Sequence, residues 1–180
     1  TTQPEAGIFQ NQLISIYLLS SLLADDYQIL VKEHPRQFDD LEDFKFYRGN
    51  YFYNNIIKLK SVDILQVDED TKEILNKASV VVTANGTSGW EALKAGKPVI
   101  LFGDPWYSRC FGAIHINDLV KKPYILKELI REKQNIISSA EKLEKYILSK
   151  FTSYLSLDRV LKFSNIKNNE KNFWKMIGIK

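Results

Sequence analysis

The sequence predicts an α/β fold with a Rossmann-like, doubly wound and mostly parallel sheet, and three observations favour it. Short apolar runs alternate with helical patterns along the chain. One run, residues 80–82, consists of three valines and is typical of a strand covered on both faces. Polar or glycine-bearing loops follow these runs, as they do at the carboxyl ends of parallel strands.

The elements are expected in the following order. Apolar side chains recur at helical spacing over residues 9–24, and Asp25 and Asp26 end that helix. Pro35 marks the exit of the first strand, because proline cannot continue a sheet ladder. Strands are predicted at residues 28–33, 62–67, 80–82, 99–102 and 113–116, and helices at 71–77, 88–95 and 124–151. Residues 68–70 are acidic and are interpreted as the N-terminal cap of the helix that follows them.

Length and composition restrict the class of protein. The chain has 180 residues, of which 44% are hydrophobic, and its net charge is +3. This charge argues against a nucleic-acid binder, and the single Cys110 excludes an internal disulfide and favours a reducing compartment. No apolar run approaches the roughly 20 residues of a membrane span, so a cytoplasmic protein is expected. Residues 1–122 are expected to form the Rossmann-like domain, and residues 123–180 to form basic C-terminal helices.

The charge is distributed unevenly. Residues 1–120 carry 11 basic and 16 acidic side chains, whereas residues 121–180 carry 14 basic and 6 acidic ones. Solvated helix faces account for such a basic segment. The alternative is attraction to an anionic membrane surface or an anionic glycan.

The loop and helix start at residues 84–91 are a candidate anion site. The first turn of a helix presents free N–H groups and the positive end of the helix dipole. Asn85 and Gly86 precede the predicted helix, Thr87 and Ser88 add hydroxyl groups, and Glu91 lies where a carboxylate can accept hydrogen bonds from a ribose. The alternative is structural, because Ser88 and Glu91 also have the spacing of a capping box.

Two other strand ends carry polar or aromatic residues. His34 follows the first strand beside Lys32 and is a candidate donor to a phosphate or a base, or else a structural histidine. Trp106 and Tyr107 follow residues 99–102 and either stack on a base or sugar or pack on helix ends. The two histidines, His34 and His115, have no partners at metal-ligand spacing, so no metal site is expected.

Several of these motifs together resemble the capsule polysaccharide biosynthesis family of bacterial glycosyltransferases, which includes β-Kdo transferases. The motifs that carry the resemblance are Gln3-Pro4-Glu5, Lys32-Glu33-His34-Pro35, residues 86–93, Gly96-Lys97-Pro98-Val99 and Phe102-Gly103 with Trp106-Tyr107. The resemblance implies the C-terminal half of a GT-B fold, which binds a nucleotide sugar without a metal or another cofactor.

The resemblance also implies roles for individual residues. His34 and Pro35 would contact the nucleotide of a CMP-activated donor, with Lys32, Asn85 and Gly86 beside it. Thr87 and Ser88 would hold its phosphate, and Glu91 its ribose. Gln3 would lie toward the donor or acceptor with Trp106 and Tyr107, and Glu5 is the one candidate for catalysis.

As a member of this family, the chain would transfer Kdo from CMP-Kdo to a lipid-linked glycan acceptor. The N-terminal Rossmann domain of a GT-B enzyme would be missing from residues 1–180, so the chain alone is expected to be inactive. In this setting the basic last third would contact the anionic inner membrane. Two alternatives stay open: a CDP-glycerol-type polyol-phosphate transferase, and a non-catalytic binding module of a capsule assembly or export complex.

Overall fold

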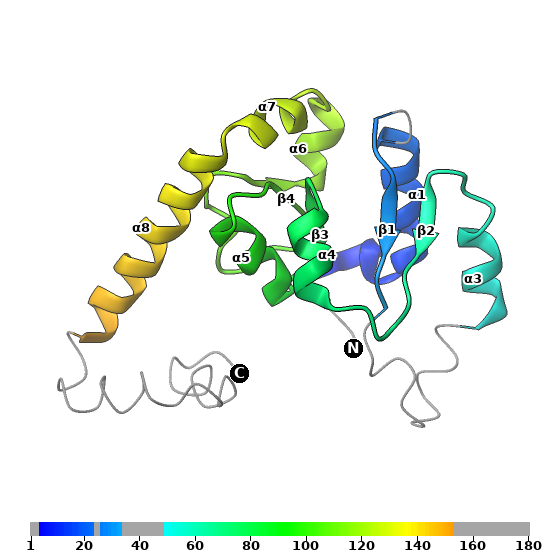
Figure 1. Cartoon of the computed structure of the whole chain (residues 1–180), viewed down its shortest axis with the longest axis horizontal. Coiled ribbons are helices and arrows are strands. Elements are labelled where there is room, and N and C mark those ends of the chain that lie inside the picture. The colour runs from blue at the N-terminus through cyan, green and yellow to red at the C-terminus, as the bar shows by residue number, and fades with distance from the viewer. Residues whose placement is uncertain (1–3, 24–25, 34–48, 153–180) are drawn as a thin grey trace. The chain divides into compact units, whose positions relative to one another are not determined.

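The structure, a computed structural model, describes residues 4–23, 26–33 and 49–152 (Figure 1). The chain divides into two compact units, residues 1–140 and 141–180. The strands that the structure describes belong to the first unit, and the second begins within the long helix α8 (Lys133–Thr152). The predicted boundary between residues 122 and 123 stays a prediction. No helix in the described ranges is long and apolar enough to cross a bilayer.

The first part of the chain forms a two-stranded parallel sheet with helices on one face. A 3₁₀ segment η1 (Pro4–Gln10) leads into helix α1 (Gln12–Leu23), which precedes strand β1 (Ile29–Val31). Helix α3 (Asn50–Ile56) then precedes strand β2 (Val62–Ile64), which pairs with β1 in parallel. Figure 1 shows α1 and α3 beside this pair, and their apolar side chains bury a cluster against it: Leu13, Ile16, Phe52, Ile56 and Val62.

The second sheet has three parallel strands in the order β3-β4-β5. These are Val81–Thr83, Val99–Leu101 and Ala113–His115, with Val82 opposite Ile100 and Ile100 opposite Ile114. Strand β4 lies in the middle and all its residues are buried. Helix α5 (Thr87–Lys94) makes the crossover from β3 to β4 and packs through its small or apolar face.

One helix links the cores of the two sheets. The C-terminal half of α1 contributes Leu19 and Leu23 to a cluster that also holds Ile100 of β4 and Ile114 of β5. Helices α6 (Ile116–Lys121) and α7 (Ile125–Arg131) complete this cluster. The molecule is therefore an α/β protein with parallel strands and C-terminal helices, as the sequence predicted.

Most predicted elements occur where they were expected. Helix α4 (Thr71–Lys77) has the predicted bounds, and Asp70 caps it by accepting a hydrogen bond from the Lys72 amide at 2.7 Å. The single helix predicted over residues 124–151 is divided into α7 and α8 at Glu132. Helices α3 and α6, of seven and six residues, were not predicted.

The prediction of a strand covered on both faces is wrong for β3. Val82 is 39% exposed, and Leu30 at the centre of β1 is 50% exposed. Helix α4 buries none of its side chains, so it gives these strands little cover. Among the described strands, hydrogen bonds join β1 to β2 and β3 to β4 and β5, so the doubly wound sheet consists of two ladders.

Candidate functional site

The start of helix α5 differs from the predicted capping box. Gly86 is the N-cap residue, with extended backbone angles, and no side chain caps the helix. The helix begins at Thr87, so Ser88 lies inside the first turn and does not occupy the capping position. The capping-box interpretation of Ser88 and Glu91 is therefore wrong, because a capping box needs its serine at the N-cap.

The loop before α5 is held by its own strand. The Gly86 amide donates a hydrogen bond to the Thr83 Oγ1 at 2.9 Å, and the Gly89 amide donates to the Gly86 carbonyl at 3.2 Å. Thr87 is exposed and Ser88 is half-buried. Two hydroxyl groups and the amides of the first turn are thus presented at the carboxyl end of β3, in the arrangement that binds anions.

The buried side chain of Tyr107 holds this loop through a hydrogen bond. Its side chain is 1% exposed, and its hydroxyl donates a hydrogen bond to the Gly86 carbonyl at 2.5 Å. Burial raises the pKa of Tyr107 to about 12, so the phenol stays protonated and keeps donating. A side chain at Gly89 would collide with this hydroxyl and with Thr83, and glycine is required there for the close approach of Tyr107.

An aromatic surface adjoins the helix start. The rings of Trp90 and Trp106 lie with their centroids 4.6 Å apart, and Trp106 meets Tyr107 edge-on at 5.4 Å. The Lys94 ammonium lies 5.7 Å from the centroid of the Trp90 ring. Trp106 is 38% exposed, whereas the buried Tyr107 fixes the loop, and the stacking of a sugar or base on either ring stays a prediction.

The strand end after β1 is described only in part. The Lys32 ammonium donates a hydrogen bond to the Val67 carbonyl at 2.7 Å, and Glu33 is 3% exposed. This contact forms because β1 and β2 run side by side in parallel, which brings the two strand exits together. The predicted nucleotide residues His34 and Pro35, and Gln3, lie outside the described residues. Glu5 belongs to η1.

The Asn85 carboxamide lies against Gly103, at the end of β4. A Cβ atom at Gly103 would collide with this carboxamide, so glycine allows the two loops to meet. The predicted site residues that the structure brings together are therefore Asn85, Gly86, Thr87 and Ser88, with Trp106 and Tyr107 from the next strand end. Glu91 is exposed one turn further along α5.

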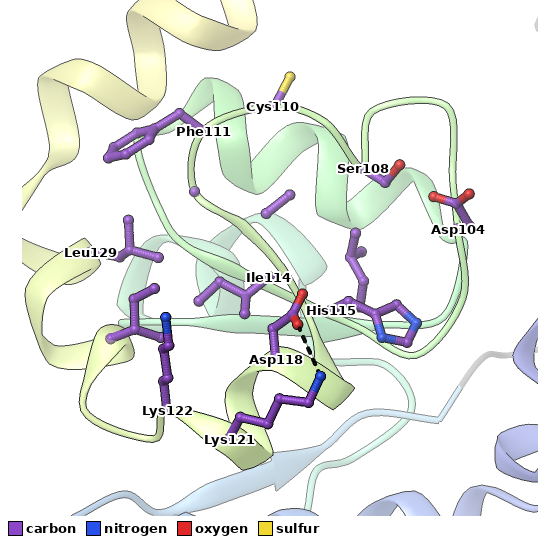
Figure 2. Close-up of a pocket in the computed structure, with 14 residues that line it drawn as sticks. Asp104, Ser108, Cys110, Phe111, Ile114, His115, Asp118, Lys121, Lys122 and Leu129 are labelled. Atoms are coloured by element: carbon purple, nitrogen blue, oxygen red, sulfur yellow. Dashed lines mark ion pairs between the residues drawn. The ribbon is translucent and has the colours of Figure 1, made fainter.

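A pocket of about 500 Å³ lies at the other side of the three-stranded sheet, along the edge strand β5 (Figure 2). It extends from the loop after β4 to helices α6 and α7. Residues that line it include Leu101, Asp104, Ser108, Phe111, Ile114, His115, Asp118, Lys121, Lys122 and Leu129. Apart from the loop after β4, these positions were not predicted for a site. His115 is the one whose place near the end of a predicted strand was a usable signal.

Local contacts fix the polar groups of this pocket. His115 is the N-cap residue of α6, and its Nδ1 accepts a hydrogen bond from the Asn117 amide at 3.3 Å. Asp118 and Lys121 form an ion pair at 4.0 Å on successive turns of α6, and Figure 2 shows the two side chains turned toward each other. Cys110 lines the same pocket and is buried. Burial raises the pKa of its thiol, and a hydrogen bond with Ser139 lowers it, so the net shift is upward and opposes thiolate formation.

Comparison with known proteins places the chain in a family. A family model described as "Capsule polysaccharide biosynthesis protein" matches residues 16–112. The match runs from α1 to the loop before β5, and it includes the start of α5 and the aromatic surface. No curated protein and no solved structure matches the sequence. Because the matched region is more than half of the 180 residues, the chain belongs to the capsule polysaccharide biosynthesis protein family.

Proposed function

We propose that this chain is the donor-nucleotide-binding part of a GT-B glycosyltransferase of capsule or surface polysaccharide, which transfers Kdo from CMP-Kdo to a lipid-linked glycan. The observation that carries the proposal is the uncapped first turn of α5 at the carboxyl end of β3. Family membership supports a role in capsule synthesis, and this helix start supplies a place for the phosphate of the donor.

The residues around the helix start suit the other parts of a nucleotide. Thr87 and Ser88 offer hydroxyl groups to the phosphate, and Glu91 offers a carboxylate to the ribose. Trp106 is exposed beside them and offers an aromatic face to the base or the sugar. We expect His34 and Pro35, after the neighbouring strand, to add contacts to the base.

Transfer itself also requires an acceptor site and a catalytic group. In a GT-B enzyme the acceptor binds largely in a second Rossmann-like domain, and Glu5 is the one candidate for catalysis on this chain. The proposal requires no metal. Nucleotide binding is therefore the property to measure first, because the residues proposed for the phosphate and the ribose are among those that the structure describes.

Calorimetric titration with CMP, CDP, UDP and GDP tests the proposal. We expect the chain to bind CMP most tightly, and Ser88→Ala to weaken CMP binding about tenfold, because a hydrogen bond to a charged phosphate is worth about 1.5–3 kcal/mol. Ser79→Ala is the matched control, since Ser79 is exposed in the loop before β3, and it should leave the affinity unchanged.

The other outcomes contradict the proposal in recognisable ways. A preference for CDP would favour a polyol-phosphate transferase over a Kdo transferase. The absence of binding to all four nucleotides would favour a non-catalytic module of capsule assembly. An equal loss of affinity in Ser88→Ala and Ser79→Ala would show that the start of α5 is not the phosphate site.

A further inference from the structure

The pocket along β5 is a second concave site, separate from the start of α5. Strand β4 lies between β3 and β5, and neighbouring strands are about 4.8 Å apart, so β5, which lines the pocket, is about 10 Å from β3. The pocket is also lined by Leu101 of β4 and by Asp104 and Ser108 of the loop that follows it. Its lining does not include Asn85, Gly86, Thr87, Ser88 or Glu91, the residues proposed for the nucleotide.

The lining of the pocket combines an apolar floor with a polar rim. Leu101, Ile114 and Leu129 form aliphatic surface, and Phe111, which is 45% exposed, adds an aromatic ring at one end. Ser108, Asp104 and Lys122 add hydrogen-bonding groups, as the close-up shows (Figure 2). A pyranose ring has the matching pattern, because its C–H faces are apolar and its hydroxyl groups project from its rim.

The charges of the rim favour a neutral ligand. Two carboxylates, Asp104 and Asp118, are balanced by two ammonium groups, Lys121 and Lys122. Asp118 and Lys121 already neutralise each other as an ion pair. A nucleotide diphosphate would meet two carboxylates here, whereas sugar hydroxyl groups donate to carboxylates and accept from ammonium groups without a charge penalty.

We propose that the pocket between β5 and helices α6 and α7 binds one or two neutral pyranose units of a glycan. Its volume, about 500 Å³, lies within the range of small-molecule sites. The proposal deepens the proposed function and rests on it for the source of the pyranose units, a neutral segment of the lipid-linked glycan. Leu101, Asp104, Ser108 and Phe111 lie within the region that the family model matches, whereas the residues of α6 and α7 lie beyond it.

Proton–nitrogen correlation spectra of the ¹⁵N-labelled full chain test the inference. The probes are the methyl pyranosides of glucose, galactose and N-acetylglucosamine, with glucuronate as the charged comparison. We expect at least one neutral pyranoside to give saturable shifts at the amides of residues 104–122, with a dissociation constant on the order of millimolar.

Two pairs of substitutions locate the binding. Asp104→Ala with Lys122→Ala removes two exposed rim groups, and binding should weaken about tenfold, equivalent to ~1.4 kcal/mol. Asp68→Ala with Lys58→Ala changes two exposed side chains of the same types outside the pocket lining and should leave binding unchanged. The proposal is overturned if the shifts persist after the first pair of substitutions, or if no neutral pyranoside produces shifts. It is also overturned if glucuronate alone produces them.

A CMP titration of the same samples separates this inference from the proposed function. Pyranoside binding without CMP binding would contradict the donor role and leave the pocket assignment standing. CMP binding without pyranoside binding would contradict the pocket assignment alone. If pyranosides shift the amides of α5 and leave those of β5 and α6 unaffected, the sugar binds at the helix start and the pocket assignment is wrong.

Discussion

At the scale of single residues, the start of α5 depends on one buried phenol. Tyr107 donates to the Gly86 carbonyl, and Gly89 has no side chain to keep the ring away. The same carbonyl accepts the Gly89 amide, so the hydroxyl and the helix share one acceptor. The loop between β3 and α5 is therefore held in position by a residue of the loop that follows β4.

Tyr107→Phe should destabilise the protein by about 1 kcal/mol at neutral pH, because the half-buried Gly86 carbonyl loses a hydrogen bond while the ring stays in place. Urea unfolding followed by circular dichroism measures the change. Tyr124→Phe is the matched control, since Tyr124 is 60% exposed, and its effect should be within a few tenths of a kcal/mol. Equal effects of the two substitutions would contradict the role given to Tyr107.

The same pair of proteins gives an expected pH dependence. The folded-state pKa of Tyr107 is raised to about 12 from an ordinary value of 10.0, so its contribution is fully present below pH 10. This contribution is lost as the pH rises from 10 through about 12, because the unfolded chain releases the proton first. The stability difference between wild type and Tyr107→Phe should therefore shrink over that range, and a constant difference would contradict the assigned pKa.

At the scale of elements, α5 is closed at one end and open at the other. Its C-terminus forms a Schellman motif, in which the Lys97 amide donates to Ala92, the Gly96 amide donates to Leu93, and Gly96 has a φ of 76°. Its N-terminus has no side-chain cap. Backbone hydrogen bonds thus close the C-terminal turn of α5, whereas its N-terminal end is held through the Gly86 carbonyl and carries no side-chain cap.

The Lys97 side chain joins this turn to α4. Its ammonium donates to the Asn76 carbonyl at 2.9 Å and to the Ala78 carbonyl. Burial lowers the pKa of Lys97, and the nearby Lys133 lowers it further. Because α4 buries no side chain, these two hydrogen bonds form a large share of its attachment.

Lys97→Met should therefore loosen α4 locally. We expect amide hydrogen exchange over residues 71–78 to become about tenfold faster, while the amides of β4 keep their protection. Lys77→Met is the control, since Lys77 is exposed on α4 and makes neither contact. Unchanged exchange in α4 after Lys97→Met would show that other contacts hold the helix.

Elements were predictable from sequence where local chemistry decides them. The cap at Asp70 and the apolar residues of β4 each give a local signal, and both predictions were confirmed. The capping box at Ser88 failed because the N-cap residue is Gly86, and a glycine has no side chain that marks this position in the sequence. The prediction that the strand at Val82 is covered on both faces was wrong, because the burial of a strand depends on how helices distant in sequence pack on it.

At the scale of the whole molecule, the strand order decides which residues can share a site. The rule for strand ends indicated the loops after β3 and β4, and the structure joins them through Tyr107 and Asn85. The pocket beside β5 was not predictable in the same way, because it needs α6 and α7 to close one side. Its polar residues also read as ordinary solvated side chains in the sequence.

The uneven charge of the chain leads to a last proposal, that the basic last third holds the protein at an anionic membrane surface. The net charge of residues 121–180 is positive by eight, and each basic side chain near such a surface contributes about 1 kcal/mol. We expect the chain to sediment with vesicles that contain phosphatidylglycerol and not with vesicles of phosphatidylcholine alone. Binding should fall steeply with salt, because screening removes most of the attraction beyond one Debye length. This length is about 10 Å at 0.1 M and becomes shorter as salt is added.

A charge variant separates this attraction from other binding. Replacing Lys162, Lys167, Lys171, Lys175 and Lys180 with Gln removes five positive charges, and vesicle binding should weaken at least tenfold. The matched comparison removes five positive charges from residues 1–120, whose net charge is negative. It replaces Lys32, Lys45, Lys58, Lys60 and Lys72 with Gln. The position of the charges, and not the net charge, decides the result if only the first variant loses binding. Equal losses, or binding indifferent to salt and to anionic lipid, would contradict a membrane role for this segment.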